Sequence, residues 1–111
     1  MPDNFPLLFF KSLADDTRLK ILLLLIAEQE LCVCELTSAL ALSQPKISRH
    51  LSLLKQQELI SSRRQGQWVF YSLSSGLPDW CAQTLRECFT EHQAYMQADL
   101  ARLTRMAPGC A

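Results

Sequence analysis

Apolar residues recur at helical spacing through most of the chain, and this pattern predicts five helices and one β-hairpin. Residues 5–14 form a short helix with apolar side chains on more than one face. A second helix is expected from Asp15-Asp16-Thr17, which supplies N-cap residues, to about Glu28. Its centre, residues 21–26, is apolar on every side, as in a helix at the middle of a core.

Two short helices follow, over residues 30–40 and 43–55, with a break at residues 41–43. The second of them has an apolar stripe of Ile47, Leu51 and Leu54 and carries basic and amide side chains elsewhere. Ser43 is its expected N-cap. Two short helices joined by a tight turn, the second of them basic, are typical of a helix-turn-helix, whose second helix enters the major groove of DNA.

The remaining pattern predicts a hairpin and a long last helix. Strand-forming residues at 68–71 follow Gly66, which is placed to turn a hairpin, or wing. Residues 79–106 then form a helix. Its apolar stripe comprises Cys81, Leu85, Cys88, Phe89, His92, Met96, Leu100 and Leu103. No later element covers this stripe, so we expect it to pack on the same helix of a second chain.

The chain is therefore predicted to be one domain over residues 1–111, mainly α with a small β-hairpin wing: a dimeric winged helix-turn-helix of five helices. The helices at 5–14 and 79–106 are the expected dimerisation elements. The sequence has no membrane-length apolar run and no N-terminal signal pattern, which predicts a cytoplasmic location. Its five cysteines are then expected to be reduced thiols.

The charge distribution points to nucleic acid. The whole chain is neutral, but residues 41–72 carry five basic side chains against one acidic one, a net charge of +4 that leaves −4 on the remainder. A basic face on an acidic body is the electrostatic footprint of DNA binding. With only three glycines, the chain has no glycine-rich loop, and no nucleophile with a base or oxyanion-binding loop was found, so an enzyme is not predicted.

The candidate DNA contacts lie on the second helix of the pair and on the wing. Basic side chains bind phosphates or guanine edges, and Gln pairs with adenine. The candidates are Ser43, Gln44, Lys46, Ser48, Arg49 and His50 on the helix, and Arg63, Arg64 and Gln65 at or near the tip of the wing. Each segment taken alone also fits a simpler interpretation, a solvated surface helix and an ordinary surface hairpin.

Cys32 and Cys34 stand one residue apart where the helix-turn-helix begins. A helix N-terminus lowers the pKa of a thiol, and thiolates favour soft ions. On a just-starting helical turn the two sulfurs can converge on one ion, which predicts an inducer site for a thiophilic metal or metalloid. The simpler interpretation is that one cysteine is a buried core residue and the other has no role. A redox switch is a third, although a bridge between such close cysteines is strained.

Three segments closely resemble the arsenic-responsive repressors of the ArsR/SmtB family, and residues 13–19 resemble the family's N-terminal signature. The three are Glu30-Leu31-Cys32-Val33-Cys34-Glu35-Leu36, Ser43-Gln44-Pro45-Lys46-Ile47-Ser48-Arg49-His50-Leu51 and Arg64-Gln65-Gly66-Gln67-Trp68-Val69. The resemblance spans about residues 5–80. It implies a homodimeric winged helix-turn-helix repressor that binds double-stranded operator DNA, needs no cofactor, and leaves the DNA when trivalent arsenic or antimony binds Cys32 and Cys34.

The chain departs from the family pattern at Thr37, where better-known members have a third cysteine. The third arsenic ligand is then an outside thiol such as glutathione, or Cys110, or it is absent. We expect Cys81 and Cys88 to be packing residues. The family's zinc site on the last helix is not predicted, because its acids and its single histidine lack the required spacing. The residues considered were Asp79, Glu91, His92 and Asp99.

Rival functions remain open at this point. Within the same fold, the alternatives are a thiol-based sensor of cadmium or lead and the redox switch described above. Outside it, the rivals are a small enzyme such as an arsenate reductase, and a metal carrier. A carrier needs neither a basic helix nor a wing, so salt-dependent DNA binding distinguishes a repressor from it.

Overall fold

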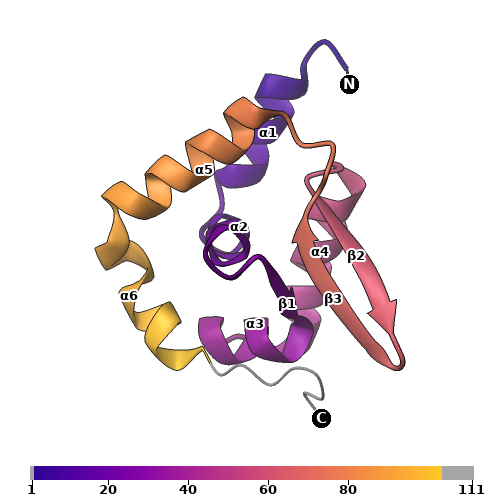
Figure 1. Ribbon diagram of the computed structural model, residues 1–111, viewed down its shortest axis with the longest axis vertical. Coiled ribbons are helices and arrows are strands. Elements are labelled where there is room, and N and C mark those ends of the chain that lie inside the picture. The colour runs from indigo at the N-terminus through magenta and orange to yellow at the C-terminus, as the bar shows by residue number, and fades with distance from the viewer. Residues whose placement is uncertain (1, 104–111) are drawn as a thin grey trace.

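The computed structural model describes residues 2–103, which form six helices and one three-stranded antiparallel sheet (Figure 1). In chain order the elements are α1 (Phe5–Leu13), α2 (Asp16–Glu28), β1 (Glu30–Cys32), α3 (Val33–Leu40), α4 (Gln44–Gln56), β2 (Ile60–Gln65), β3 (Trp68–Leu73), α5 (Asp79–Glu91) and α6 (Gln93–Arg102). The mainly helical winged fold is the predicted one, but it has one helix more than predicted and an extra strand.

Helix α2 lies at the centre of the molecule, where Figure 1 shows it end-on with the other helices and the sheet around it. Its N-cap is Asp15, whose carboxylate accepts a hydrogen bond from the Arg18 backbone N–H at 3.0 Å. The side chains from Ile21 to Leu25 are all buried, including those on opposite sides of the helix. A helix that is apolar all round is stable only with neighbours on every side, and α1, α3, α4, α5 and α6 supply them.

Helices α3 and α4 form the predicted helix-turn-helix, with a connection of three residues at 41–43. Ala41 ends α3 in the left-handed conformation, at φ 55°. Ser43 is the N-cap of α4 as expected, and its hydroxyl accepts from the Lys46 backbone N–H at 3.4 Å. Ile47, Leu51 and Leu54 are buried against the core, which fixes the other side of α4 toward solvent.

The sheet has the strand order β1-β3-β2, and the long hairpin of β2 and β3 projects beyond the helices (Figure 1). Gly66 turns the hairpin at φ 63°, a conformation that glycine adopts without steric cost. The expectation that residues 30–32 open the third helix is wrong. Glu30, Leu31 and Cys32 pair with Ser72, Tyr71 and Phe70 of β3, and α3 begins only at Val33.

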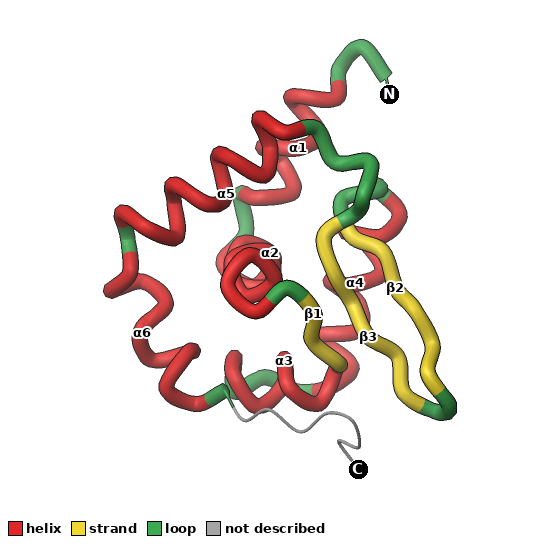
Figure 2. The backbone as a smooth tube through the Cα atoms, viewed as in Figure 1, coloured by secondary structure: helices red, strands yellow, loops and turns green. Residues whose placement is uncertain are grey.

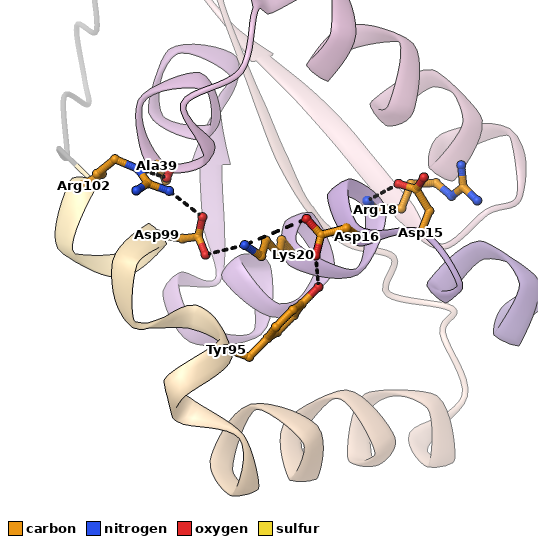
Figure 3. Close-up of polar contacts among 8 residues, drawn as sticks. All are labelled: Asp15, Asp16, Arg18, Lys20, Ala39, Tyr95, Asp99 and Arg102. Atoms are coloured by element: carbon orange, nitrogen blue, oxygen red, sulfur yellow. Dashed lines mark hydrogen bonds and ion pairs between the residues drawn. The ribbon is translucent and has the colours of Figure 1, made fainter.

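The predicted last helix is also wrong as a single element, because it breaks at His92 into α5 and α6 (Figure 2). Tertiary contacts explain the break: Met96 is buried in the core, and Asp99 binds Lys20 of α2 (Figure 3). Arg102 donates from Nε to the carbonyl oxygen of Ala39 in α3, at 2.9 Å. A straight helix would place α6 out of reach of these partners. The predicted end at residue 106 lies outside the described residues.

Consequently much of the apolar stripe on the last helix is covered within one chain. Cys81, Leu85 and Met96 are buried, and Cys88 packs against the same core, so the two cysteines are packing residues as predicted. Large apolar side chains instead remain exposed where α1 meets the start of α5. These are Leu7, Phe10 and Trp80. Between residues 2 and 103, no helix has both the length and the apolar character needed to cross a membrane.

Candidate nucleic-acid interface and thiol pair

The outer face of α4 carries most of the predicted helical DNA contacts. Gln44, Lys46 and Arg49 are exposed, Ser48 is half-buried, and Ser43 is exposed at the N-cap. The apolar stripe on the opposite side is buried, so the helix is held by one face and offers the other. Amide, hydroxyl and cationic donors on one free helix face have the chemistry needed to contact phosphates and base edges.

His50 does not belong to this outer face, and the expectation that it faces DNA is corrected. Its side chain is 8% exposed, and Nδ1 lies 3.9 Å from Asp15 Oδ2 at the start of α2. Burial lowers the pKa of His50, although the Asp15 carboxylate opposes this shift. The hydrogen bond from the Arg18 backbone lowers the pKa of Asp15 in turn. His50 therefore lies between α4 and the N-terminus of α2.

The wing presents Arg63, Arg64 and Gln65 on β2, all of them exposed. Arg63 is engaged within the protein: its Nε and Nη2 donate to the two carboxylate oxygens of Glu30, each at 2.7 Å. A third bond runs from Arg63 Nη1 to Gln65 Oε1 at 2.8 Å. The hydrogen bonds to Glu30 raise the pKa of Arg63, because they stabilise its charged form. Arg64 extends the basic surface toward the tip.

The predicted thiol pair lies between the sheet and α3. Cys32 ends β1 and is the N-cap residue of α3, with an extended backbone at φ −89° and ψ 169°. Cys34 lies in the first turn of the helix. Because Cys32 is not yet helical, the rule that residues two apart on a helix point away from each other does not apply. Cys32 and Phe70 form a small buried cluster, and Cys34 and Trp68 pack against it.

A capping box fixes the backbone at this point. The buried Glu35 carboxylate accepts a hydrogen bond from the Cys32 backbone N–H at 3.0 Å. Thr37, which stands in the place of the family's third cysteine, donates its hydroxyl to the Cys34 carbonyl oxygen at 2.8 Å. That bond turns the Thr37 hydroxyl toward its own helix. The two sulfurs are therefore the soft ligands that the start of α3 offers, and Cys110 lies outside the described residues.

The residues considered for a zinc site on the last helix are placed differently. Asp99 is paired with Lys20 at 3.0 Å and with Arg102 at 2.9 Å, while Asp79, Glu91 and His92 are exposed. Within the part of the chain that the structure describes, no group of three or more His, Cys, Asp or Glu residues is placed to hold a metal ion.

Sequence reasoning missed the environment of the thiol pair. Phe70 and Trp68 were recognised only as strand formers, and Glu30 was assigned to a helix. In the structure all three lie around Cys32 or hold the wing residue Arg63. Residues 30–32 are too short for an alternating pattern to identify a strand. One signal was available in the sequence: β3 is apolar or aromatic at four successive positions, 68–71, which is typical of a strand with side chains covered on both faces of the sheet.

Comparison with known proteins agrees with this geometry. The family described as bacterial regulatory protein, arsR family, matches residues 15–62, which include the helix-turn-helix. The arsenic resistance transcriptional regulator ArsR1 of Pseudomonas putida is 48% identical over 101 residues, which cover 91% of this chain and 79% of that protein. The arsenical resistance operon repressor of Escherichia coli is 50% identical over 100 residues, covering 90% of this chain and 86% of the repressor.

Solved structures with a similar fold also exist. HlyU from Vibrio cholerae superimposes with a TM-score of 0.73 at 34% identity, and the match covers 84% of this chain and 99% of HlyU. The agreement extends over the winged helix-turn-helix rather than over a single motif. These relatives are transcriptional regulators, a class that acts by binding DNA.

Proposed function

Because this chain belongs to the arsR family of bacterial regulatory proteins, we propose that it is a transcriptional repressor of an arsenic-resistance operon. In this proposal it binds operator DNA through α4 and the wing, and leaves the DNA when trivalent arsenic or antimony binds Cys32 and Cys34. A repressor bound to its operator acts in the cytoplasm, where thiols are kept reduced.

The observation that carries the proposal is the position of the thiol pair. Cys32 and Cys34 lie at the first turn of α3, and α3 packs directly against α4. Two thiols with soft sulfur donors suit a thiophilic metalloid. In a regular helix, side chains two residues apart point away from each other. Cys32 has an extended backbone, so this restriction does not apply to the two sulfurs. A ligand that draws them together acts on the helix that supports the DNA-binding helix.

The operator contacts follow from exposure. We assign base-edge or phosphate contacts to Gln44, Lys46 and Arg49, with Ser43 and Ser48 at the margin of the same face. Arg64 and Gln65 contact the DNA backbone from the wing. His50 is left out because it is buried, and Arg63 because its donors are engaged by Glu30 and Gln65.

We further propose that the repressor is a homodimer joined through α1 and α5. Phe10 and Trp80 are both exposed, and their ring centroids are 6.0 Å apart, so they form one apolar surface with Leu7. An exposed aromatic patch of this kind marks an interaction site. A dimer also places two copies of α4 on the two half-sites of an operator, about 34 Å apart.

Fluorescence anisotropy tests the proposal, with DNA from immediately upstream of the protein's own gene as the probe. Arsenite, antimonite, cadmium and zinc are titrated into the protein–DNA complex under reducing conditions. The Cys32→Ser/Cys34→Ser variant is measured in parallel, and Cys81→Ser serves as a control for loss of a thiol elsewhere. The expected result is release of wild type and Cys81→Ser by arsenite and antimonite, with the double variant remaining bound.

Other outcomes have defined meanings. Release by cadmium alone would show that the inducer is a different soft metal. Release only by an oxidant would indicate a redox-switched repressor of the same fold. A wild-type protein that fails to bind this DNA at low salt would contradict the repressor function itself, since phosphate contacts are strongest there.

A further inference from the structure

One row of side chains crosses all three strands of the sheet. Cys32 in β1 is paired directly with Phe70 in β3, and Phe70 is paired directly with Arg63 in β2. Residues directly opposite each other on antiparallel strands project their side chains from the same face. The thiol, the ring and the guanidinium are therefore neighbours in one cross-strand row, which runs from the thiol pair to the wing.

Arg63 is fastened at its end of this row by two partners. Its guanidinium carbon lies 4.7 Å from the centroid of the Phe70 ring, a cation–π contact. It also donates two hydrogen bonds of 2.7 Å to the carboxylate of Glu30, the first residue of β1. Arg63 thus reaches over β3 and ties the outer strand of the wing to the strand that ends at Cys32.

The other end of the row is closed to solvent. Cys32 is 2% exposed and Phe70 is 5% exposed, with Cys34 and Trp68 packed against them. Protein interiors leave no room for an added atom, so an ion that bridges the half-buried Cys34 to the buried Cys32 sulfur displaces a neighbour of Cys32. The Phe70 ring is the neighbour directly opposite Cys32.

We propose that Phe70 and Arg63 transmit metalloid binding from the thiol pair to the wing, an inference that rests on the proposed function. When trivalent arsenic joins Cys32 and Cys34, the Phe70 ring moves, Arg63 loses its contacts with the ring and with Glu30, and the wing separates from β1. Arg63 is thus a positioning residue that holds the wing in its DNA-binding place, and Arg64 makes the backbone contact. The signal reaches the DNA through the wing as well as through α3.

The chemistry of this step balances without an oxidant. Cys32 and Cys34 displace two hydroxyl groups of arsenous acid: two As–O bonds break, two As–S bonds form, and the two thiol protons leave with the hydroxyls as two waters. Arsenic stays trivalent. We call the state with Arg63 on Phe70 and Glu30 closed, and the state with the wing separated from β1 open. Arsenic favours the open state only to the extent that it binds that state more tightly than the closed one.

The test distinguishes a role of Arg63 in holding the wing to β1 from a direct contact of Arg63 with DNA. Glu30→Gln removes the charge that holds Arg63, and Arg63→Lys keeps the positive charge but loses the two-point fork and the planar stacking. Glu58→Gln is the matched control, because it removes one exposed carboxylate from the same basic region between α4 and β2. The unsubstituted protein is the background for comparison, and the arsenite-dependent change in emission is assigned to Trp68, which packs beside Cys34, because Trp80 lies on α5.

Arsenite is titrated into free protein with Trp68 emission as the readout, and the operator is then added for anisotropy. The Arg63–Glu30 pair stabilises the state in which the wing is held to β1, so its loss should lower the apparent arsenite Kd by up to about fivefold in Glu30→Gln and in Arg63→Lys. The double variant should show no further decrease, because both changes remove the same interaction. Glu58→Gln should match the background protein.

The outcomes distinguish this inference from the function on which it rests. If the background protein is released by arsenite while Glu30→Gln and Arg63→Lys keep its arsenite Kd and Trp68 response, the function stands and the inference is overturned. An Arg63→Lys variant that loses operator affinity without any change in arsenite Kd would likewise overturn it, in favour of a phosphate contact. If the background protein neither binds the operator nor responds to arsenite, the proposed function fails, and the inference fails with it.

Discussion

Asp99 and Lys20 form an ion pair of 3.0 Å that joins α6 to the central helix α2. The Asp99 side chain is 2% exposed, whereas Lys20 retains 21% of its side-chain exposure and also lies 5.0 Å from the Tyr95 ring centroid. Arg102 binds the second oxygen of the same carboxylate at 2.9 Å. This buried carboxylate is therefore one of the contacts that hold α6 in its folded-back position (Figure 3).

Asp99→Asn should lower the free energy of unfolding by about 2–3 kcal/mol, because it leaves two cations with a neutral partner. Breaking a fully buried pair costs about 3–5 kcal/mol, and the partial exposure of Lys20 reduces the penalty. Urea unfolding followed by circular dichroism measures the change. Glu91→Gln, at the exposed end of α5, is the control and should stay within about 0.5 kcal/mol of wild type. Equal stability of Asp99→Asn and wild type would refute the role of the pair.

The break between α5 and α6 also marks the limit of sequence reasoning about the fold. Neither proline nor glycine occurs near His92, and the apolar spacing continues through it, so local signals favour one long helix. The preference is overridden by contacts with residues far away in the sequence, Lys20 and Ala39. By contrast, the turn at 41–43 and the hairpin at Gly66 were predictable, because a cap residue and a positive φ are local requirements.

For the candidate site, too, the sequence predicted local features but not contacts between distant residues. Helical spacing identified the exposed face with Lys46 and Arg49, but His50 was wrongly placed with them, off the apolar stripe. It lies three residues after Ile47 and four before Leu54, which places it on the buried side of the same helix. Cross-strand neighbours depend on pairing register, so the contact of Arg63 with Phe70 was beyond what spacing along the chain can give.

Arg49→Ala should weaken operator binding and reduce the slope of log K against log salt by about 1, because the lost contact releases one counterion fewer. Arg49 is exposed on the outer face of α4, where a phosphate contact is available. Anisotropy at several salt concentrations measures the slope. Arg86→Ala on α5 removes the same charge at an exposed position outside the α4 and wing surface proposed to contact DNA, and should leave the slope unchanged. A larger effect from Arg86→Ala than from Arg49→Ala would contradict the assignment of α4.

His50 should make stability depend on pH near neutrality. Burial lowers its pKa below the ordinary value of 6.5, so the unfolded chain binds more protons than the folded protein between the two pKa values. The free energy of unfolding should therefore fall as the pH decreases below about 6.5, by at most about 1.4 kcal/mol per pH unit, and level off below the folded pKa. Stability is fully retained above pH 6.5. Chemical denaturation from pH 5 to 8 measures this dependence.

Replacement of the two histidines resolves which of them is responsible. His50→Gln should flatten the stability profile across this range, while His92→Gln, at an exposed position between α5 and α6, should reproduce the wild-type profile. Asp15→Asn should make the fall start at the same pH and continue to a lower one, because the carboxylate that supports protonation of His50 is gone. A His50→Gln profile identical to that of wild type would contradict the buried position of this histidine.

Cys81 should be the least reactive of the thiols in the described part of the chain. Burial raises its pKa to about 11, compared with an ordinary 9.0. At pH 8 its thiolate fraction is then roughly one hundredth of that of an ordinary thiol, and its alkylation by iodoacetamide should be slower by at least this factor. Peptide mass spectrometry compares it with the half-buried Cys34 and Cys88. In urea the difference should vanish, and a fast-reacting Cys81 in the folded protein would contradict its burial.

Phe10→Glu should dissociate the proposed dimer while leaving the folded chain intact. Phe10 is 50% exposed on α1 and lies beside Trp80 of α5, so a carboxylate is solvated in the monomer but unpaired at an apolar interface. Aromatic residues at the centre of an interface contribute about 2 kcal/mol or more, so the dimer Kd should rise at least about 30-fold. Leu53→Glu is the matched control, because Leu53 is similarly exposed but lies on α4. Sedimentation equilibrium should find Leu53→Glu dimeric and Phe10→Glu monomeric, and the reverse result would place the dimer interface on α4 instead.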